Sequence, residues 1–557
     1  MAQGAPGTGD RPSAFGPDFP FSFDRWLHHP MGLGAVPAEA HGAQVAVIGA
    51  GISGVVAAHE LMRLGLRPVV FEAGRIGGRL RSVRFGAADD VIAELGGMRF
   101  PETGRSFFHY VDEVGIETRP FPNPLTPAAP TTMIELEGER HYAQTAADLP
   151  PIFGEVADAW RSALEDHASL AAMKAAIGRR DASAVRDLWH PIVRAWDDRT
   201  FYDFVASSDA FARLSYRHRE IFGQVGFGTG GWDSDFPNSM LEILRVVMSE
   251  FEENQHLIVG GAESLVRRLW SHPARNPAHW APETSLSSLH SGAPRPGVSS
   301  IVRGADGRLD VTDHNDVVRA FDAVLCTTQS WLLTTNISVE EGLFSHKVWM
   351  ALDRTRYMQS AKTFVMVDRP FWTDIDPETG RQVMSMTLTD RNTRGTYLFD
   401  NGADLPAVIC LSYAWMSDAM KVLPKSAAER ARLALETLAK VYPDVDIRSH
   451  VIGEPLTVSW EADPNFLGAF KGALPGHYRY NRRMYAHFMQ HDMEPGHRGV
   501  FLAGDDVSWT PGWAEGAVQT ALNAVWGIMT HFGGVTHPDN PGPGDVWHDR
   551  QPLALPE

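Results

Sequence analysis

Cysteine is scarce in this sequence: of 557 residues, only Cys326 and Cys410 are cysteines. Two thiols cannot form the disulfide framework of a small secreted domain or a thiolate metal cluster, and their number suits a reducing compartment. The opening residues lack both a basic and an apolar segment, so we expect no signal peptide and a cytoplasmic location. No run of about 20 apolar residues occurs, so we expect no membrane span.

Positive charge is also in short supply. The chain has 50 Lys and Arg against 68 Asp and Glu, a formal net charge of −18. This balance argues against a nucleic-acid surface and against binding to anionic membranes, and it is compatible with a cationic small substrate. The remaining composition, 44% apolar and 21% charged, is typical of a globular protein, and the length suggests two or more folding units.

A glycine-rich turn stands out near the N-terminus. Residues 44–72 predict a buried strand, an amphipathic helix and a second strand, with Gly49, Gly51 and Gly54 at the first turn and Glu72 at the end. The glycines permit a tight turn, close approach of a pyrophosphate and close helix–strand packing, and the glutamate can accept from a ribose hydroxyl. The alternative is a glycine turn without a ligand, but the complete βαβ context favours dinucleotide binding.

The order of predicted elements suggests two interleaved domains. Residues 106–251 are mostly helical, short strands return over 256–335, strands and one helix alternate over 346–489, and a strand and a last helix follow. We predict an α/β protein with a Rossmann-like dinucleotide-binding domain and a mixed α+β substrate-binding domain. The expected pieces are an extended arm over the body (1–37), the dinucleotide domain (38–105, 252–345 and 490–535), the substrate domain with a helical insertion (106–251 and 346–489), and a C-terminal tail (536–557).

Five longer motifs carry a family resemblance. They are "AGRIGGRLRS" (73–82), "AELGGMRFP" (93–101), "FGTGGWDSDFPNSMLEI" (227–243), "WEADPNFLGAFKGALPGHYRYNRRMYAHFMQ" (460–490) and "AGDDVSWTPGWAEGAVQT" (503–520). The chain resembles the flavin-dependent amine oxidase superfamily and, within it, the bacterial L-lysine 2-monooxygenases. It is more remotely similar to tryptophan 2-monooxygenase and phenylalanine oxidase. Because the motifs lie in both predicted domains, the resemblance covers the whole chain.

The resemblance implies non-covalently bound FAD. In that superfamily the second glycine pair and its arginine contact the diphosphate, and a late acid lies near the ribityl and phosphate groups. A helix that opens between Gly512 and Gly516 would direct its positive end at the flavin. The cofactor-binding residues implied are Gly49, Gly51, Ser53, Gly54, Glu72, Gly78, Arg79, Gly97, Met98, Arg99, Val302, Asp505, Trp513 and Ala514.

The resemblance also implies a clamp for an amino acid. Arg99 would grip the substrate carboxylate through two parallel hydrogen bonds, with the Tyr413 hydroxyl as a second contact. Lys362 would lie beside flavin N5, where its charge would help O2 accept an electron. Read alone, Arg99 could be a structural ion-pair partner and Lys362 a solvated edge residue.

The distal end of the substrate is predicted to meet an acid. Asp235 would face the side-chain amino group of lysine, while Trp415, Phe470 and Trp513 would line the aliphatic stem. A buried carboxylate among aromatics is costly unless a cation faces it. The alternative is that Asp233 or Asp235 caps the following helix; we expect Asp233 to be the structural one.

The reaction implied is the oxidative decarboxylation of L-lysine by O2 to 5-aminopentanamide, CO2 and water. Alternatives are the same reaction on L-arginine, a pure L-amino-acid oxidase that releases H2O2 and ammonia, or a non-catalytic flavin-fold binding protein. His487 and His491 have metal-ligand spacing but lack a third ligand, so we expect no metal site. A homo-oligomer, dimer or larger, is expected by analogy with relatives.

Overall fold

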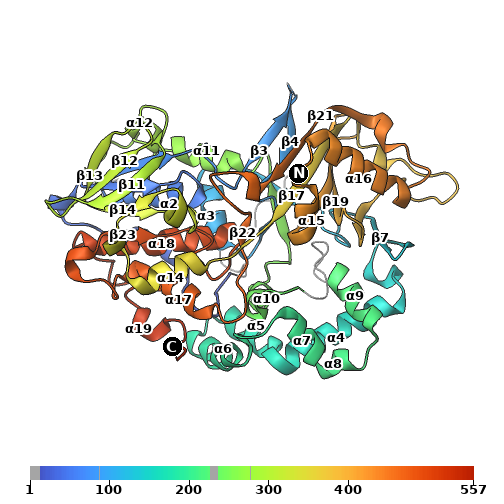
Figure 1. The fold of residues 1–557 in the computed structure, drawn as a ribbon, viewed down its shortest axis with the longest axis horizontal. Helices are drawn as coiled ribbons and strands as arrows, with labels where there is room; N and C mark the ends of the chain where they lie inside the picture. The colour runs from blue at the N-terminus through green and yellow to red at the C-terminus, as the bar shows by residue number, and fades with distance from the viewer. Residues whose placement is uncertain (1–12, 87, 226–235, 276–277, 557) are drawn as a thin grey trace.

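The computed structural model describes residues 13–86, 88–225, 236–275 and 278–556. Two sheet-containing lobes lie side by side along the long axis, and a layer of helices runs beneath them (Figure 1). The strands of the left-hand lobe come from three separated parts of the chain, residues 44–72, 295–339 and 500–502, while those of the right-hand lobe come mainly from residues 360–459. The architecture is a mixed α/β fold with both parallel and antiparallel sheets.

The left-hand lobe is built on a parallel sheet. In the described part of the chain its strand order is β10-β2-β1-β14-β23. The predicted βαβ unit is present, with helix α2 at Ile52–Arg63 between β1 and β2. The strands are β1 (Gln44–Ile48), β2 (Arg67–Glu72), β10 (Arg295–Pro296), β14 (Ala323–Cys326) and β23 (Val500–Leu502).

Both faces of this sheet are covered, which explains why β1 is apolar and buried from Val45 to Ile48. Val45 and Val47 face α2 and the long helix α18 (Ala514–His531), while Ala46 and Ile48 face an antiparallel sheet on the other side. A strand buried on both faces loses the polar alternation of a half-exposed strand. The second sheet has the order β13-β12-β11-β15 and contains β11 (Val298–Arg303), β12 (Leu309–Asp313), β13 (Val318–Phe321) and β15 (Ser338–Val339).

The right-hand lobe contains a larger, mostly antiparallel sheet of order β21-β17-β20-β19-β18-β7-β8. Helix α16 (Ala427–Val441) packs on it and begins with a capping box between Ser426 and Glu429. The strands are β7 (Thr132–Leu136), β8 (Glu139–Ala143), β17 (Ser360–Val367), β18 (Met386–Thr389), β19 (Gly395–Phe399), β20 (Ala407–Trp415) and β21 (Val451–Ser459).

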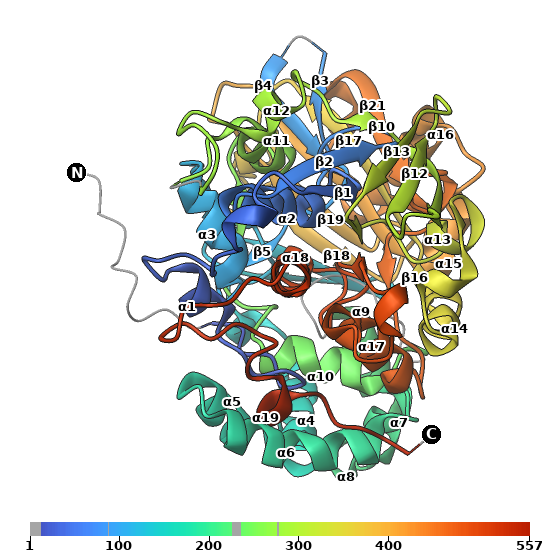
Figure 2. The same cartoon turned by 90° about the vertical axis from the view of Figure 1, so that its left-hand side faces the viewer.

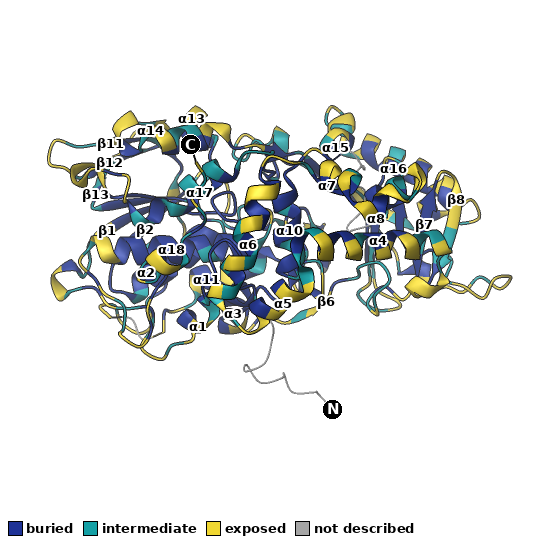
Figure 3. Ribbon diagram, turned by 90° about the horizontal axis from the view of Figure 1, so that it is seen from below, coloured by how far each residue is buried: buried dark blue, intermediate teal, exposed yellow. Residues whose placement is uncertain are grey.

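The described part of the region predicted to be mostly helical also supplies three strands, β6 (Thr118–Pro120), β7 and β8. β7 and β8 form a hairpin whose turn residues Glu137 and Gly138 have φ of 52° and 83°. Two successive positive φ angles are those of the hairpin turn that favours glycine, so the alternating "TMIELEGERHYA" was a missed strand signal. The helices that follow show buried inner and exposed outer faces (Figure 3). They are α4 (Pro151–Ala168), α5 (Leu170–Gly178), α6 (Ala182–Trp196), α7 (Phe201–Ser207), α8 (Asp209–Ala212) and α9 (Tyr216–Val225).

The N-terminal arm was predicted to lie extended over the body of the protein. Its described part packs into the core. Phe15 and Trp26 are 2% and 1% exposed, and a short helix α1 (Phe23–Leu27) interrupts the extended backbone. Burial of its aromatic side chains stabilises the arm against the core. The glycine and proline content of the segment had suggested a more loosely attached chain. The C-terminal segment lies beside the arm (Figure 2), with Arg550 donating to the Pro20 carbonyl at 2.9 Å.

Candidate flavin and substrate site

A cavity of about 350 Å³ lies where the two lobes and the helical layer meet. Its volume falls in the range of ligand-binding cavities. One end is lined by the glycine turn after β1 and the end of β2, and the other by β17, β20 and helix α10 (Met240–Met248). The predicted residues that line it are Gly49, Gly51, Ser53, Glu72, Gly78, Arg79, Gly97, Met98, Arg99, Lys362, Tyr413, Trp415, Phe470, Asp505, Trp513 and Ala514.

The glycine turn is shaped by close backbone contacts. Gly49 has φ of +110°, and a Cβ on Gly54 would lie 2.0 Å from the Gly49 carbonyl oxygen. Gly54 therefore lets α2 pack against the turn and does not line the cavity, consistent with the packing role of a third glycine. A Cβ on Gly96 would lie 1.8 Å from the Arg79 carbonyl oxygen, so the two glycine-containing segments pass in direct contact.

Two helices begin at the cavity without a side-chain cap. Gly51 precedes α2 and Trp513 precedes α18, and neither donates or receives a capping hydrogen bond through a side chain. Free N–H groups at a helix start are a ready anion site, so these two ends fit a diphosphate and an electron-rich ring. The buried Ser53 hydroxyl at the first helical turn has no protein partner within the described residues, which also fits a ligand there.

Glu72 occupies the predicted place at the end of β2. Its carboxylate accepts from the N–H groups of Ala50 and Gly74, both at 2.7 Å. Burial raises the pKa of Glu72, although these hydrogen bonds act in the opposite direction and lower it. The backbone thus fixes the carboxylate at the rim of the cavity, where a ribose hydroxyl would be recognised.

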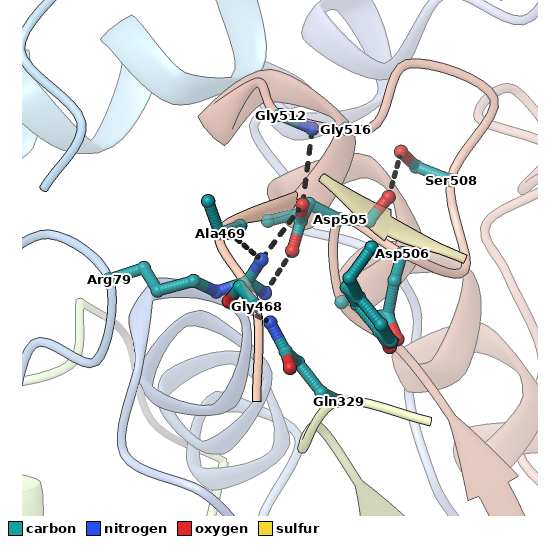
Figure 4. A network of polar contacts seen from close by, with 12 residues as sticks. Arg79, Gln329, Gly468, Ala469, Asp505, Asp506, Ser508, Gly512 and Gly516 are labelled. Atoms are coloured by element: carbon teal, nitrogen blue, oxygen red, sulfur yellow. Dashed lines mark hydrogen bonds and ion pairs between the residues drawn. The ribbon is translucent and has the colours of Figure 1, made fainter. Parts of the chain in front are cut away.

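An arginine and an acid from opposite ends of the chain meet on the cavity wall (Figure 4). Arg79 forms an ion pair with Asp505 and also donates to the Ala469 carbonyl at 2.9 Å. Asp505 in turn accepts from the Gly512 N–H at 3.1 Å, which ties the loop before α18 to the glycine pair. This network orders both segments that the resemblance assigns to the cofactor.

The predicted clamp residue Arg99 lies among aromatic rings. Its guanidinium carbon is 5.6 Å from the ring centre of Tyr413 and 5.8 Å from those of Tyr397 and Phe121. An Nη1 atom donates to the Tyr397 hydroxyl at 3.5 Å. The described residues contain no ion pair of Arg99 within 4.0 Å, so its charge faces rings and the cavity, an arrangement suited to binding a carboxylate.

Lys362 and Tyr413 are direct partners across strands β17 and β20. The Lys362 ammonium lies 4.7 Å from the Tyr413 ring centre and donates to the carbonyls of Glu94 and Gly96. Burial lowers the pKa of Lys362 to about 8. The predicted catalytic residues Arg99, Tyr413 and Lys362 are therefore brought to one end of the cavity, and Lys362 is a buried cation, not the solvated edge lysine of the alternative.

Aromatic side chains form the remaining wall. The rings of Trp415 and Phe470 meet edge to face at 6.0 Å, and Trp415 also contacts the ring of Tyr413 at 5.2 Å. Trp513 packs on Phe251 at 5.1 Å. All three predicted wall residues thus line the same cavity as Arg99.

Two predicted site residues that the structure describes, Gly54 and Val302, do not line this cavity. Gly54 packs behind the turn, and Val302 lies on β11 with 40% of its surface exposed. Val298, four residues earlier on the same strand, lines the cavity instead. A register shift between Val298 and Ser300 breaks the alternation of the strand, so that Ile301 is buried and Val302 is exposed. Asp235 and Asp233 lie outside the described residues, although the next residue, Phe236, lines the cavity. Helix α10 is capped by Ser239, which fills the capping role considered for the two acids.

Sequence reasoning missed several polar residues of the site. Tyr397 contacts Arg99, Glu252 lines the cavity, and Lys471 is a buried lysine whose ammonium donates to Asn481 and Ser508. Lys471 lies in the segment "FLGAFKGALPG" (466–476). A single basic residue among apolar ones is a sequence signal for a buried lysine. Within the described residues no set of three side chains suited to a metal ion occurs, and no helix is long and apolar enough to cross a membrane.

Comparison with known proteins agrees with this geometry. The family of flavin containing amine oxidoreductases matches residues 52–529. Tryptophan 2-monooxygenase of Pseudomonas savastanoi is 30% identical over 550 residues, covering 92% of this chain and 93% of that protein. The putative L-amino-acid oxidase YobN of Bacillus subtilis is 23% identical over 505 residues, covering 88% and 95%. In fold, cyclohexylamine oxidase from Brevibacterium oxydans superposes with a TM-score of 0.65 at 18% identity, covering 88% of this chain and all of that one.

The fold and the cavity define a flavin-dependent oxidoreductase of amines or amino acids. Its uncapped helix starts, glycine contacts and buried cation fit a bound flavin nucleotide. The chain belongs to the family of flavin containing amine oxidoreductases.

Proposed function

We propose that this protein is an FAD-dependent L-lysine 2-monooxygenase. The observation that carries the proposal is the placement of Arg99, Tyr413 and Lys362 at one end of an aromatic-walled cavity that also contains the dinucleotide cradle. A guanidinium and a tyrosine suit an α-carboxylate, which a simple amine substrate lacks. The similarity to a tryptophan 2-monooxygenase supports the reaction class.

The substrate is held at both ends. Arg99 and Tyr413 bind the carboxylate, the rings of Trp415, Phe470 and Trp513 surround the stem, and Asp235 binds the distal ammonium. Two fixed ends leave the α-carbon little freedom, which lowers the entropic cost of reaching the reactive geometry. FAD, held non-covalently by the residues around Gly49, Glu72 and Arg79, supplies hydride acceptance and the reaction with O2. Lys362 places a positive charge where negative charge develops on oxygen.

Retention of the imino acid decides between the two possible outcomes. If the clamp holds it while O2 reacts, the product is 5-aminopentanamide with CO2 and water. If it escapes, water hydrolyses it and the protein acts as an oxidase that releases H2O2 and ammonia. Exclusion of water by the aromatic wall favours the first outcome.

Anaerobic mixing with single amino acids tests the substrate. We expect L-lysine to bleach the flavin faster than L-arginine, L-ornithine or L-tryptophan, and mass spectrometry to find 5-aminopentanamide after air is admitted. Faster reduction by L-tryptophan would instead favour the second candidate, a tryptophan 2-monooxygenase, which the 30% identity over most of both chains supports. A keto acid in place of the amide would identify a pure oxidase.

Replacement of Asp235 tests the distal anchor. Asp235→Asn should lower kcat/KM for L-lysine by about 10²-fold or more, because sites built for a polar partner discriminate by up to about 10⁴-fold. The rate with L-norleucine, which has no distal ammonium, should change little. Asp233→Asn is the matched control. If the ratio of kcat/KM for L-lysine to that for L-norleucine were unchanged in the Asp235 variant, Asp235 would not bind the distal ammonium. The reason to prefer lysine as the substrate would then be lost.

A further inference from the structure

Among the described residues, four acids line the cavity, and three of them already have partners. Glu72 accepts from two backbone N–H groups, Asp505 pairs with Arg79, and Glu242 pairs with Arg245 at 2.9 Å. Glu252 is the fourth, and no hydrogen bond or ion pair of its carboxylate is found in the described chain. A carboxylate turned to a cavity without a protein partner has capacity for a ligand cation.

The position of Glu252 identifies which part of a ligand it would meet. It follows Phe251, whose ring packs on Trp513, and its charge acts on Arg99 and on Tyr397. Arg99 itself donates to Tyr397, so these three side chains share one end of the cavity. Glu252 thus lies beside the carboxylate clamp and not at a separate site.

We propose that Glu252 receives the α-amino group of the substrate while Arg99 and Tyr413 hold its α-carboxylate. This proposal rests on the proposed function, since it assigns one more contact to the same amino acid. A base and an acid at neighbouring positions match the two charges that every α-amino acid carries on its α-carbon. The pair explains how the site can select amino acids over plain carboxylates and plain amines.

The same contact gives Glu252 a chemical role. Burial raises the pKa of Glu252 to about 7, against the opposing charge of Arg99. At pH 8 it is therefore ionised, yet a stronger base than an ordinary glutamate, as proton transfer near neutral pH requires. One N–H bond of the substrate ammonium breaks and one O–H bond forms on the Glu252 carboxylate. The electron pair stays on the nitrogen, and the neutral amine is the form from which the α-carbon can be oxidised.

Binding of hexanoate tests the pairing without any turnover. Hexanoate has the carboxylate but no amine, so an ionised Glu252 beside Arg99 should repel it. We expect calorimetry on the flavin-loaded protein to find a Kd about 10-fold lower at pH 6 than at pH 8, the factor for one group that titrates at about 7. Other groups at this end contribute less: Arg99 stays charged, burial keeps Tyr397 and Tyr413 neutral, and Lys362 titrates only at about 8. Burial also raises the pKa of Glu94 to about 7, but its carboxylate accepts from the Ser82 hydroxyl and the Ala262 N–H and acts on Lys362. Because Glu94 is present in the wild type and in a Glu252 variant alike, the difference between their pH profiles reports on Glu252.

Two single variants separate this role from a structural one. Glu252→Gln should bind hexanoate with a Kd that changes about 2-fold or less between the two pH values. The groups that still titrate are Lys362 and Glu94, and the Glu94 carboxylate is bound by Ser82 and Ala262. Glu253→Gln is the matched control: Glu253 is the next residue, is exposed, and pairs with Lys174 at 3.2 Å, so the full pH effect should persist. A wild-type Kd that is equal at both pH values would overturn the proposal even if Glu252→Gln did not fold.

Anaerobic reduction by L-lysine tests the proton transfer. Loss of a general base costs about 10²-fold or more, so Glu252→Gln should reduce at least that much more slowly at pH 8. If hexanoate behaves as expected but the reduction rate is unchanged, Glu252 binds the amino group and does not take its proton. If no L-amino acid reduces the wild-type flavin, the proposed function fails while the hexanoate result still decides whether Glu252 lies beside Arg99.

Discussion

Lys362 illustrates how one residue acquires its role from its place in a sheet. On a strand, a lysine side chain ordinarily points to solvent, yet this one is 3% exposed and faces Tyr413 across the ladder. Two of its three ammonium protons go to backbone carbonyls of the segment that follows the second glycine motif. The cation is therefore held against the cavity, and among the residues that the structure describes no acid forms an ion pair with it.

Replacement of Lys362 should separate the two half-reactions. Lys362→Met keeps the length of the side chain but removes the charge, so reoxidation by O2 should slow by about 10²-fold, the size of a lost electrostatic contact at a reacting oxygen. Flavin reduction by substrate should change much less. Stopped-flow measurement of each half-reaction checks this, with Lys421→Met, an exposed lysine, as control. Equal slowing of both would place Lys362 in substrate binding instead.

The reoxidation rate should also depend on pH. Burial lowers the pKa of Lys362 to about 8 from the ordinary 10.5, so its cation is present below pH 8 and lost as the pH rises through that value. We expect the bimolecular rate with O2 to fall between pH 7 and pH 9 in the wild type. In Lys362→Met the same profile should be flat, since the titrating group is gone.

At the scale of elements, the start of α2 determines how the cofactor cradle is built. Gly54 lies in the first turn of α2, where any side chain would press on the Gly49 carbonyl. Gly54→Ala should lower the free energy of unfolding by about 1–3 kcal/mol, the usual cost of overpacking, and weaken FAD binding. Denaturant unfolding and the flavin content of the purified protein measure these effects.

Gly154 provides the contrasting substitution. It lies in helix α4, where a Cβ would meet no atom within 4 Å. Gly154→Ala should therefore stabilise the protein by about 0.5–1 kcal/mol, because alanine is the better helix former. If both alanine variants had the same effect on stability, close packing at Gly54 would not be the reason for its glycine.

Elements with a strong local pattern were predictable, and contacts between distant elements were not. The last helix, Ala514–His531, could be predicted because its apolar face and closing glycines are local signals. The burial of the arm could not, because Phe19 packs on Tyr485 and Trp547, partners far along the chain that no local pattern reveals. Arg99 could be named from its motif, but Tyr397 comes from a strand 298 residues away in sequence and becomes a contact only through the fold.

At the scale of the whole molecule, the N-terminal arm contacts both the C-terminal segment and helix α10 in the cavity wall. Asp18 accepts from Arg245 at 2.7 Å and from the Trp189 indole at 3.0 Å, and Arg245 also pairs with Glu242 on the cavity. Both side chains of the Asp18–Arg245 pair are at most 2% exposed. The arm thus contacts α10 on one side, while Glu242 and Ile243 of the same helix line the cavity.

Neutralising Asp18 should destabilise the protein strongly. Breaking one partner of a buried ion pair costs about 3–5 kcal/mol, because the remaining charge stays buried; here Glu242 still faces Arg245, so we expect a loss near the lower value. Urea unfolding of Asp18→Asn measures it. Asp158→Asn is the control, since its pair with Arg161 is more than 70% exposed and such pairs contribute about 0–1 kcal/mol. Equal effects of the two substitutions would mean that the arm rests on the core without contributing to its stability, and that α10 keeps its place by packing alone.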